Sequence, residues 1–201
     1  EIIARKIILP TYEVFDEKRY FRSSKKVSIL EKKYNNKIWK IGITICEDLW
    51  VNETIEGRGK HKKNPVFDLA GKNIDLLLNF SASPFTIEKI KNRTKVSNFA
   101  VKHLKIPLIY INQIGGNDDL VFDGNSFVMD RHGESLMELK SFEEDYRCWD
   151  LTVNSSKFKK RKDLSEMEII FDALVLGLKD YARKCQFKTA LIGLSGGIDS
   201  A

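Results

Sequence analysis

Short apolar runs alternate with a helical pattern along the chain, and this alternation constrains the fold most. The runs IWKIGITI at 38–45, IDLLLNF at 74–80 and IPLIYIN at 106–112 are typical of strands. The run at 74–80 is short, apolar and bounded by polar residues, as expected of a strand buried on both faces. Residues 86–104, which precede the third run, have a helical pattern. Strands that alternate with helices in this way predict an α/β fold.

Weaker patterns predict the remaining elements. A helix is expected at 165–184, with Ser165 and Glu168 forming a capping box at its start. The segment GGNDDLVFDG at 115–124 is expected to be a turn-rich connection, which either is structural or lies at the exit for a small product. By composition and periodicity we expect a short helix within 64–73 and further strands at 2–9, 27–30, 126–130, 134–140, 145–153 and 189–194.

The composition changes near residue 155. The segment SSKFKKRKD at 155–163 is polar, basic and typical of a linker. We therefore expect one α/β domain over 1–155 and the beginning of a second over 156–201. Because the chain starts inside an expected strand and stops where a glycine loop would turn into a helix, we expect it to be an internal part of a longer protein.

Composition excludes several classes of function. No apolar run approaches the ~18 residues of a membrane-spanning helix, and no signal-peptide pattern is present. Three cysteines lie far apart and without zinc-ligand spacing, which favours a reducing compartment and predicts a cytoplasmic protein without a metal site. The formal net charge of +6 comes partly from lysine clusters at 60–63 and 157–162. These clusters lack interleaved aromatic residues, so we expect no nucleic-acid partner, and an anionic small substrate fits the charge equally well.

The segment GLSGGIDS at 193–200 follows an expected strand and is expected to open a helix. A glycine-rich turn in this position directs backbone N–H groups and the positive end of the helix toward an anion such as phosphate. It lacks the lysine of the Walker pattern. A plain glycine turn between a strand and a helix is the alternative interpretation.

The segment GITICEDLW at 42–50 contains Cys46 at the end of an expected strand. A lone cysteine there is most often a buried packing residue. A turn from a strand into a helix would instead expose the thiol at the sheet edge and favour the nucleophilic thiolate. Lys6 lies four residues before Pro10, and its ammonium could stabilise the oxyanion of a tetrahedral intermediate. Taken alone, Lys6 is better explained as a surface charge.

Together, these segments resemble two known families. Lys6 and the CEDLW segment resemble the nitrilase superfamily, whose catalytic set is Glu–Lys–Cys, and SGGIDS resembles the pyrophosphate loop of N-type ATP pyrophosphatases. The segments LPTYEVFDEKRYF, GITICEDLW, NFSASPF, YINQIGGNDDLVFDGNSFVMD and GLSGGIDSA occur in this order in glutamine-dependent NAD synthetases. The resemblance implies a nitrilase-like αββα sandwich, incomplete at its N-terminus, followed by the start of a Rossmann-like ATP pyrophosphatase domain.

The resemblance also implies roles for particular residues. Cys46 would attack the side-chain amide of glutamine, and Lys6 would hold the oxyanion. The glutamate base of the family would lie before Glu1. The implied glutamine-binding residues are Tyr12, Glu47, Ser83 and Lys89, where Lys89 replaces the arginine of some members and keeps the charge without the bidentate fork. The implied ATP-binding residues are Gly193, Ser195, Gly196, Gly197, Asp199 and Ser200.

The implied reaction passes ammonia from glutamine to ATP-activated deamido-NAD, with Mg²⁺ assisting the phosphate chemistry, and gives NAD, AMP and pyrophosphate. The implied partners are glutamine, deamido-NAD, ATP and further copies of the same chain in a homo-oligomer. Two alternatives remain open: another amidase or amidotransferase with a different acceptor, and a catalytically silent nucleotide-binding scaffold.

Overall fold

The computed structural model describes residues 1–12, 14–51, 63–152 and 164–197. The described elements, in chain order, are α1 (Glu17–Tyr20), β1 (Ser28–Tyr34), β2 (Lys37–Ile45), the 3₁₀ helix η1 (Cys46–Leu49), α2 (Pro65–Leu69), β3 (Leu76–Ser81), α3 (Lys89–Leu104), β4 (Leu108–Asn112), β5 (Ile114–Asn117), β6 (Leu120–Asp123), β7 (Phe127–Met129), β8 (Ser135–Glu138) and α4 (Glu166–Lys184).

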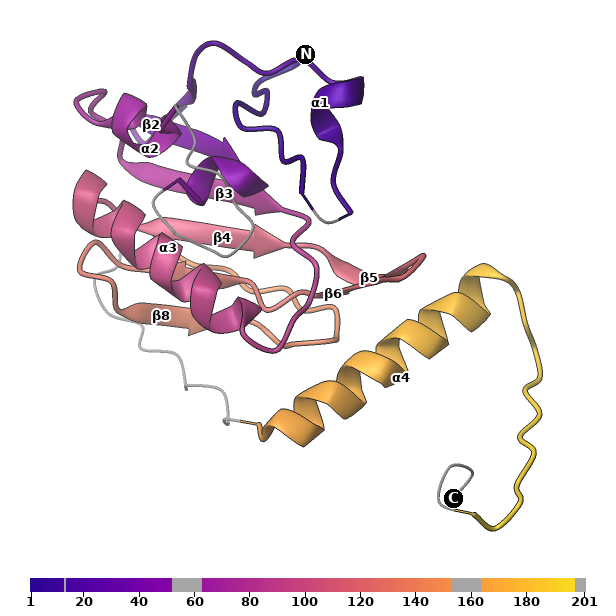
Figure 1. Ribbon diagram of the computed structural model, residues 1–201. Coiled ribbons are helices and arrows are strands. Elements are labelled where there is room, and N and C mark those ends of the chain that lie inside the picture. Colours follow the sequence, from indigo (N-terminus) through magenta and orange to yellow (C-terminus); the bar gives the residue numbers. More distant parts are fainter. Residues whose placement is uncertain (13, 52–62, 153–163, 198–201) are drawn as a thin grey trace.

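A six-stranded sheet in the order β1-β2-β3-β4-β7-β8 forms the body of the molecule (Figure 1). Its three central strands, β2, β3 and β4, are parallel to one another, whereas the outer strands pair antiparallel. Because the central strands are parallel, their carboxyl ends lie at one edge of the sheet. That edge carries the residues that follow Ile45, Ser81 and Asn112, and among them is Cys46.

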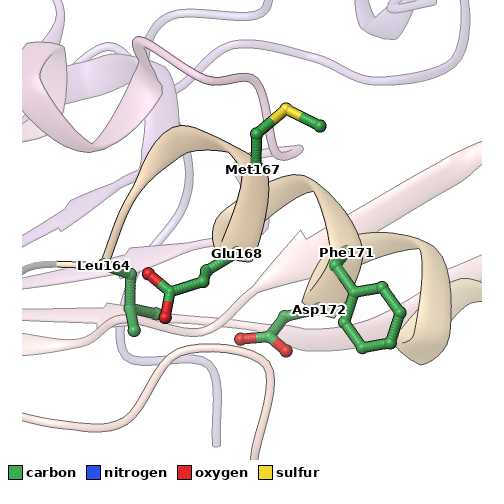
Figure 2. A pocket seen from close by; sticks show the side chains of 5 residues that line it. All are labelled: Leu164, Met167, Glu168, Phe171 and Asp172. Atoms are coloured by element: carbon green, nitrogen blue, oxygen red, sulfur yellow. The ribbon is translucent and has the colours of Figure 1, made fainter.

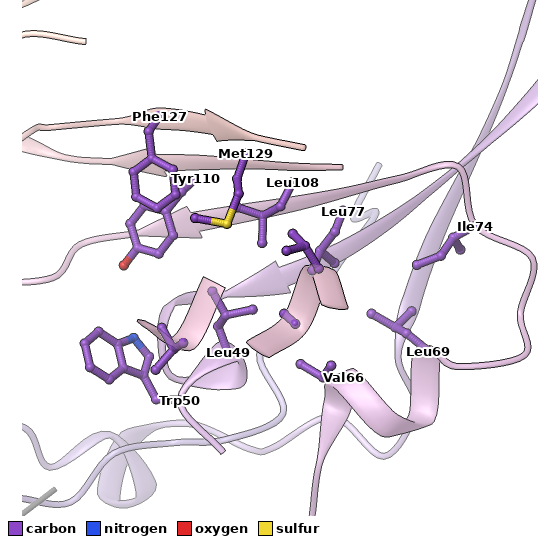
Figure 3. Packing of buried hydrophobic residues seen from close by; sticks show 13 residues of the cluster. Leu49, Trp50, Val66, Leu69, Ile74, Leu77, Leu108, Tyr110, Phe127 and Met129 are labelled. Atoms are coloured by element: carbon purple, nitrogen blue, oxygen red, sulfur yellow. The ribbon is translucent and has the colours of Figure 1, made fainter. Parts of the chain in front are cut away.

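One face of the sheet is covered by α2, η1 and α3 (Figure 1). The core between them includes Leu77 and Leu108 from the sheet (Figure 3). Val96 and Ala100 from α3 belong to the same core and are also buried. Val96 and Ala100 lie four residues apart on α3, so one stripe of the helix faces the sheet. Leu49 of η1 belongs to the same core, and this packing anchors the helix that begins at Cys46.

The opposite face of the sheet is open in the described residues. Phe80 of β3 and Ile111 of β4 are direct register partners, and their exposed fractions are 43% and 39%. The described residues thus supply one sheet of the expected sandwich together with the helices on its outer face. The α/β class expected from the alternating pattern is confirmed.

The β5–β6 hairpin extends beyond the large sheet and holds α4. Asp180 of α4 is buried, and its Oδ2 accepts a hydrogen bond from the backbone N–H of Gly116 at 2.9 Å. Lys184 Nζ donates to the carbonyl oxygen of Gly116. Ala173, which lies about two turns before Asp180 on the same face of α4, is also buried. The outer side of α4 is exposed at Met167, Phe171, Leu174 and Leu178.

Most predicted elements are present, including the helix at 165–184 and its capping box, in which Ser165 Oγ accepts from the N–H of Glu168 and Glu168 Oε2 from the N–H of Ser165. The connection at 115–124 is not merely a turn, because most of it forms β5 and β6. Three predicted strands, at 2–9, 145–153 and 189–194, are absent from the described residues, which leave out position 153. In the last of these, Leu191 and Ile192 are exposed. An apolar run forms a strand only where a neighbouring strand pairs with it, and no described segment does so here.

Candidate active site

Cys46 stands where β2 ends and η1 begins. Its backbone φ is +48°, a left-handed conformation that costs a non-glycine residue about 1–2 kcal/mol. The next three residues of η1 are buried, whereas Cys46 itself is half-buried. A thiol held in a strained turn at the carboxyl edge of a parallel sheet is well placed to react with a bound molecule. The predicted change from strand to helix at this cysteine is confirmed.

The carboxylate of Asp48 joins this turn to the segment that carries Lys6. Asp48 Oδ1 accepts from the N–H of Ile7 at 3.0 Å and of Ile8 at 2.7 Å. Its Oδ2 accepts from the N–H of Ile45 at 3.1 Å. Burial raises the pKa of Asp48 above its ordinary value, while these three N–H donors act to lower it. Residues 7–8 are thereby fixed against the residue that precedes Cys46.

Lys6 pairs with Glu17, a residue that the sequence motifs did not single out. Its Nζ lies 2.6 Å from Oε1 of Glu17, the first residue of α1. Both side chains are largely shielded from water, with exposed fractions of 14% and 24%. The carboxylate therefore restricts the partly buried ammonium to one position. The contact joins Lys6, which lies outside the described helices and strands, to a residue eleven positions further along the chain, so no periodic pattern predicts it.

Two of the predicted glutamine-binding residues contact each other. The hydroxyl of Tyr12 donates to Oε2 of Glu47 at 2.6 Å, and Glu47 is 2% exposed. Glu47 directly follows Cys46 in η1, so this bond brings the loop after residue 10 to the cysteine turn. A buried carboxylate beside the thiol is able to receive a cationic group of a substrate.

Ser83, a third predicted binding residue, is held by an extensive polar network. Its N–H donates to Oδ1 of Asn112 at 2.9 Å, and its carbonyl accepts from Nη2 of Arg93 at 2.8 Å. Arg93 is 1% exposed and pairs with the fully buried carboxylate of Asp123. Arg93 was not singled out from the sequence, because it lies within a helix rich in lysine and nothing in that pattern distinguishes it.

Lys89, the fourth predicted residue, begins α3. Its Nζ lies 5.3 Å from the ring centroid of Trp50, within the range of a cation–π contact. Trp50 directly follows η1, so Lys89 lies near the end of the short helix that Cys46 begins. Lys6, Tyr12, Glu47 and Lys89 are thus all linked to residues 45–50, either by a direct contact or through the next residue of the chain.

The glycine loop lies apart from this group. Ser195, Gly196 and Gly197 are exposed, and a side chain added at Gly193 or Gly196 would meet no neighbouring atom. Figure 1 shows this segment at the end of the extended stretch that follows α4, away from the sheet. The predicted ATP-binding residues Asp199 and Ser200 lie outside the described residues.

A shallow hollow on α4 is lined by Leu164, Met167, Glu168, Phe171 and Asp172 (Figure 2). None of the predicted site residues lines it. Within the described parts of the chain, no group of three or more His, Cys, Asp or Glu side chains could hold a metal ion. No described helix is long and apolar enough to cross a membrane.

Comparison with known proteins tests the resemblance. No family model matches the chain. It is 42% identical over 200 residues to a glutamine-dependent NAD(+) synthetase of Synechocystis, covering 98% of this chain and 35% of that protein. It is 34% identical over 196 residues to the enzyme of the same description from Acinetobacter baylyi, with coverages of 96% and 34%. The chain therefore spans about a third of the length of the curated relatives it matches.

Solved structures agree. A glutamine-dependent NAD+ synthetase from Acinetobacter baumannii, solved in complex with ADP, superposes with a TM-score of 0.79 at 33% identity and covers 98% of this chain and 35% of its own. An amidase of the nitrilase superfamily from Nesterenkonia shares the fold over 68% of this chain and 45% of its own, with a TM-score of 0.52 at 22% identity. Over almost its whole length, the chain is thus similar to about a third of a glutamine-dependent NAD(+) synthetase, and the resemblance inferred from its motifs is confirmed.

Proposed function

We propose that this chain carries the glutamine-hydrolysing part, over 1–155, and the beginning of the ATP-dependent part, over 156–201, of a glutamine-dependent NAD synthetase. The observation that carries the proposal is that the buried carboxylate of Asp48 bonds the backbone next to Lys6 and the backbone next to Cys46, in a chain with this similarity. An ammonium and a thiol carried by two segments that are joined in this way suit attack on an amide.

The first half-reaction would follow from this arrangement. The Cys46 thiolate attacks the side-chain carbonyl carbon of glutamine, and the Lys6 ammonium stabilises the resulting oxyanion. The carbon–nitrogen bond then breaks, and the amide nitrogen leaves as ammonia after taking up the proton of the thiol through the general base of the family. Water then attacks the glutamyl thioester, which releases glutamate and restores the thiol.

Substrate recognition would use the charges beside the nucleophile. The buried carboxylate of Glu47, with Tyr12 bonded to it, suits the α-ammonium group of glutamine. The ammonium of Lys89 suits its α-carboxylate. The hydroxyl of Ser83, a residue that Asn112 and Arg93 fix in place, can donate a further hydrogen bond. Both charged groups on the α-carbon of glutamine would then be held by opposite charges.

The second half-reaction would transfer ammonia to deamido-NAD after ATP has adenylated it, releasing AMP and pyrophosphate. The ATP phosphates would lie on the backbone of Ser195, Gly196 and Gly197. The ADP complex of the relative from Acinetobacter baumannii supports nucleotide binding in this class of protein. Mg²⁺ would accompany the nucleotide, whose phosphates it neutralises. We further propose a cytoplasmic homo-oligomer.

The test uses the full-length protein that contains this sequence, with Cys46→Ala. Glutamine-dependent NAD synthesis is expected to stop, while synthesis from added ammonia continues. Cys185→Ala is the matched control, because that thiol is exposed and lies at the C-terminal end of α4. Continued glutamine hydrolysis in Cys46→Ala would contradict the assignment of the nucleophile, and failure of ammonia to support synthesis would contradict the division between the two parts.

Two further measurements separate the alternatives. Product analysis with ATP, glutamine and deamido-NAD distinguishes a NAD synthetase from an amidotransferase with another acceptor. Labelling with an electrophilic glutamine analogue distinguishes both from a silent scaffold, because an inert Cys46 would favour the scaffold.

A further inference from the structure

Asp48 is a buried charge whose role is not explained by packing. It is 2% exposed, and its side chain accepts hydrogen bonds from three backbone N–H groups. A buried carboxylate is tolerated where several donors satisfy it, and an unsatisfied one is costly. The donors come from two segments about forty residues apart, at Ile7 and Ile8 on one side and Ile45 on the other.

The segment that carries Lys6 depends on these bonds for its position. Residues 1–10 belong to no described strand, so no ladder of sheet hydrogen bonds fixes them. Besides the two bonds to Asp48, the carbonyl of Lys6 accepts from the N–H of Ser24 at 2.9 Å, and the carbonyl of Ile7 accepts from Ser23 Oγ. Of these contacts, only those of Asp48 join the segment to η1.

The three donors flank the two reactive groups proposed above. Ile7 directly follows Lys6, and Ile45 directly precedes Cys46. Oδ1 of Asp48 holds the segment that follows Lys6, and Oδ2 holds the residue that precedes Cys46. We propose that Asp48 is a positioning residue that sets the separation between the Lys6 ammonium and the Cys46 thiol. This inference rests on the proposed glutamine hydrolysis and adds to it a residue that touches neither substrate nor reacting atoms.

The role requires both carboxylate oxygens as acceptors. Asn at this position keeps the size and one acceptor, but its NH₂ group would face a backbone N–H and repel it. The substitution Asp48→Asn therefore loosens one of the two segments while disturbing the core little. Because the reacting groups must be aligned in the transition state, the loosening acts on kcat more than on KM.

The experiment measures glutamine hydrolysis and ammonia-dependent synthesis in the full-length protein with Asp48→Asn. We expect kcat for glutamine to fall about 100-fold, as displacements of about 1 Å at reacting groups do. We expect KM for glutamine to stay within about threefold, because the binding groups keep their contacts. Ammonia-dependent synthesis, which does not use Cys46, is expected to be unchanged and reports that the protein has folded.

Asp75→Asn is the matched control. Asp75 also accepts a backbone N–H, that of Lys40 at 2.8 Å, but it does so at the opposite end of β2 from Cys46. It should leave both activities unchanged. A second variant, Ile8→Pro, removes one donor to Asp48 and leaves the carboxylate intact. It should lower kcat by less than Asp48→Asn.

The inference is overturned if kcat stays within about threefold of the unsubstituted protein in both Asp48→Asn and Ile8→Pro. It is also overturned if KM rises in Asp48→Asn as much as kcat falls. It is also overturned if Asp75→Asn causes the same loss. Failure of the proposed function appears elsewhere, in the unsubstituted protein or in Cys46→Ala, so the two failures can be told apart.

Discussion

Arg93 and Asp123 form a two-pronged ion pair inside the protein. Nη1 of Arg93 lies 2.8 Å from Oδ2 of Asp123, and Nη2 lies 2.8 Å from Oδ1. Both side chains are essentially excluded from water. The pair joins the middle of α3 to the end of β6, and the same guanidinium also donates to the carbonyl of Ser83. One buried cation therefore holds a proposed substrate-binding residue in place.

Removing one partner of this pair should be costly. In Asp123→Ala the guanidinium of Arg93 remains buried without its counter-charge, and we expect the free energy of unfolding to fall by about 3–5 kcal/mol. Urea unfolding followed by tryptophan fluorescence measures the loss. In the control variant Glu143→Ala, which breaks the exposed pair with Lys140, stability should be almost unchanged. Equal losses in the two variants would show that the buried pair has no special role.

Glu17 should support catalysis through Lys6. Glu17→Gln keeps a hydrogen-bond acceptor near Nζ but removes the charge that fixes the ammonium. We expect kcat for glutamine hydrolysis to fall about tenfold, in the range found when a supporting partner of a functional group is lost. The neighbouring Asp16→Asn is the control, since Asp16 is exposed and lies 3.9 Å from Arg19. Steady-state kinetics on both variants test this, and an unchanged kcat in Glu17→Gln would contradict it.

Gly115 should control how firmly α4 is held. Its φ is +123°, and a Cβ there would come within 2.7 Å of Oδ2 of Asp180. Gly115→Ala must therefore displace the carboxylate that binds the N–H of Gly116. We expect faster hydrogen exchange at that amide and along α4. Gly71→Ala is the control, because its φ is also positive but its surroundings are open. Similar exchange in both variants would assign the effect to backbone strain alone.

The elements that could be predicted from the sequence are those whose signal is local. The helix α4 shows apolar residues at helical spacing and begins with a capping box, and both features lie within a few residues of each other. The strands β2, β3 and β4 are short apolar runs that pair with one another, so propensity and tertiary contact agree. The runs at 2–9 and 189–194 have similar composition but no described partner strand, and composition alone does not supply one.

The residues of the candidate site also fall into those with a local sequence signal and those whose partners are distant in sequence. Cys46 and Lys6 stand in recognisable motifs, and their roles remain predictions. Asp48 lies within the quoted motif, but it stands beside Glu47, and nothing in the sequence shows which backbone donors surround either carboxylate. Glu17 and Arg93 gave no such signal, because their partners, Lys6 and Asp123, are distant in sequence and are brought to them only by the fold.

Because of Tyr110, the free energy of unfolding should decrease at alkaline pH. It is fully buried between the sheet and α3, and its hydroxyl donates to Oγ of Ser81 at 3.0 Å. Burial raises the pKa of Tyr110 to about 12, although the nearby charge of Arg93 acts to lower it. In the unfolded chain the same phenol ionises near its ordinary pKa of about 10.

Between these two values the unfolded state releases its proton while the folded state keeps it. The unfolded state then binds fewer protons, so the free energy of unfolding should decrease by up to about 1.4 kcal/mol for each pH unit above about 10. Below that pH the group should have no effect on the slope. Urea unfolding at several pH values between about 8 and 11 measures the decrease.

Tyr110→Phe separates this group from the other ionisable residues. The variant loses the hydrogen bond to Ser81, which should lower the free energy of unfolding by about 1 kcal/mol at neutral pH. Because phenylalanine does not ionise, the variant should also lose most of the alkaline decline. Tyr34→Phe serves as the control, since Tyr34 is 64% exposed and its removal should leave the decline as it is. If Tyr110→Phe showed the same alkaline slope as the unsubstituted protein, the decline would arise from other groups and Tyr110 would have no part in it.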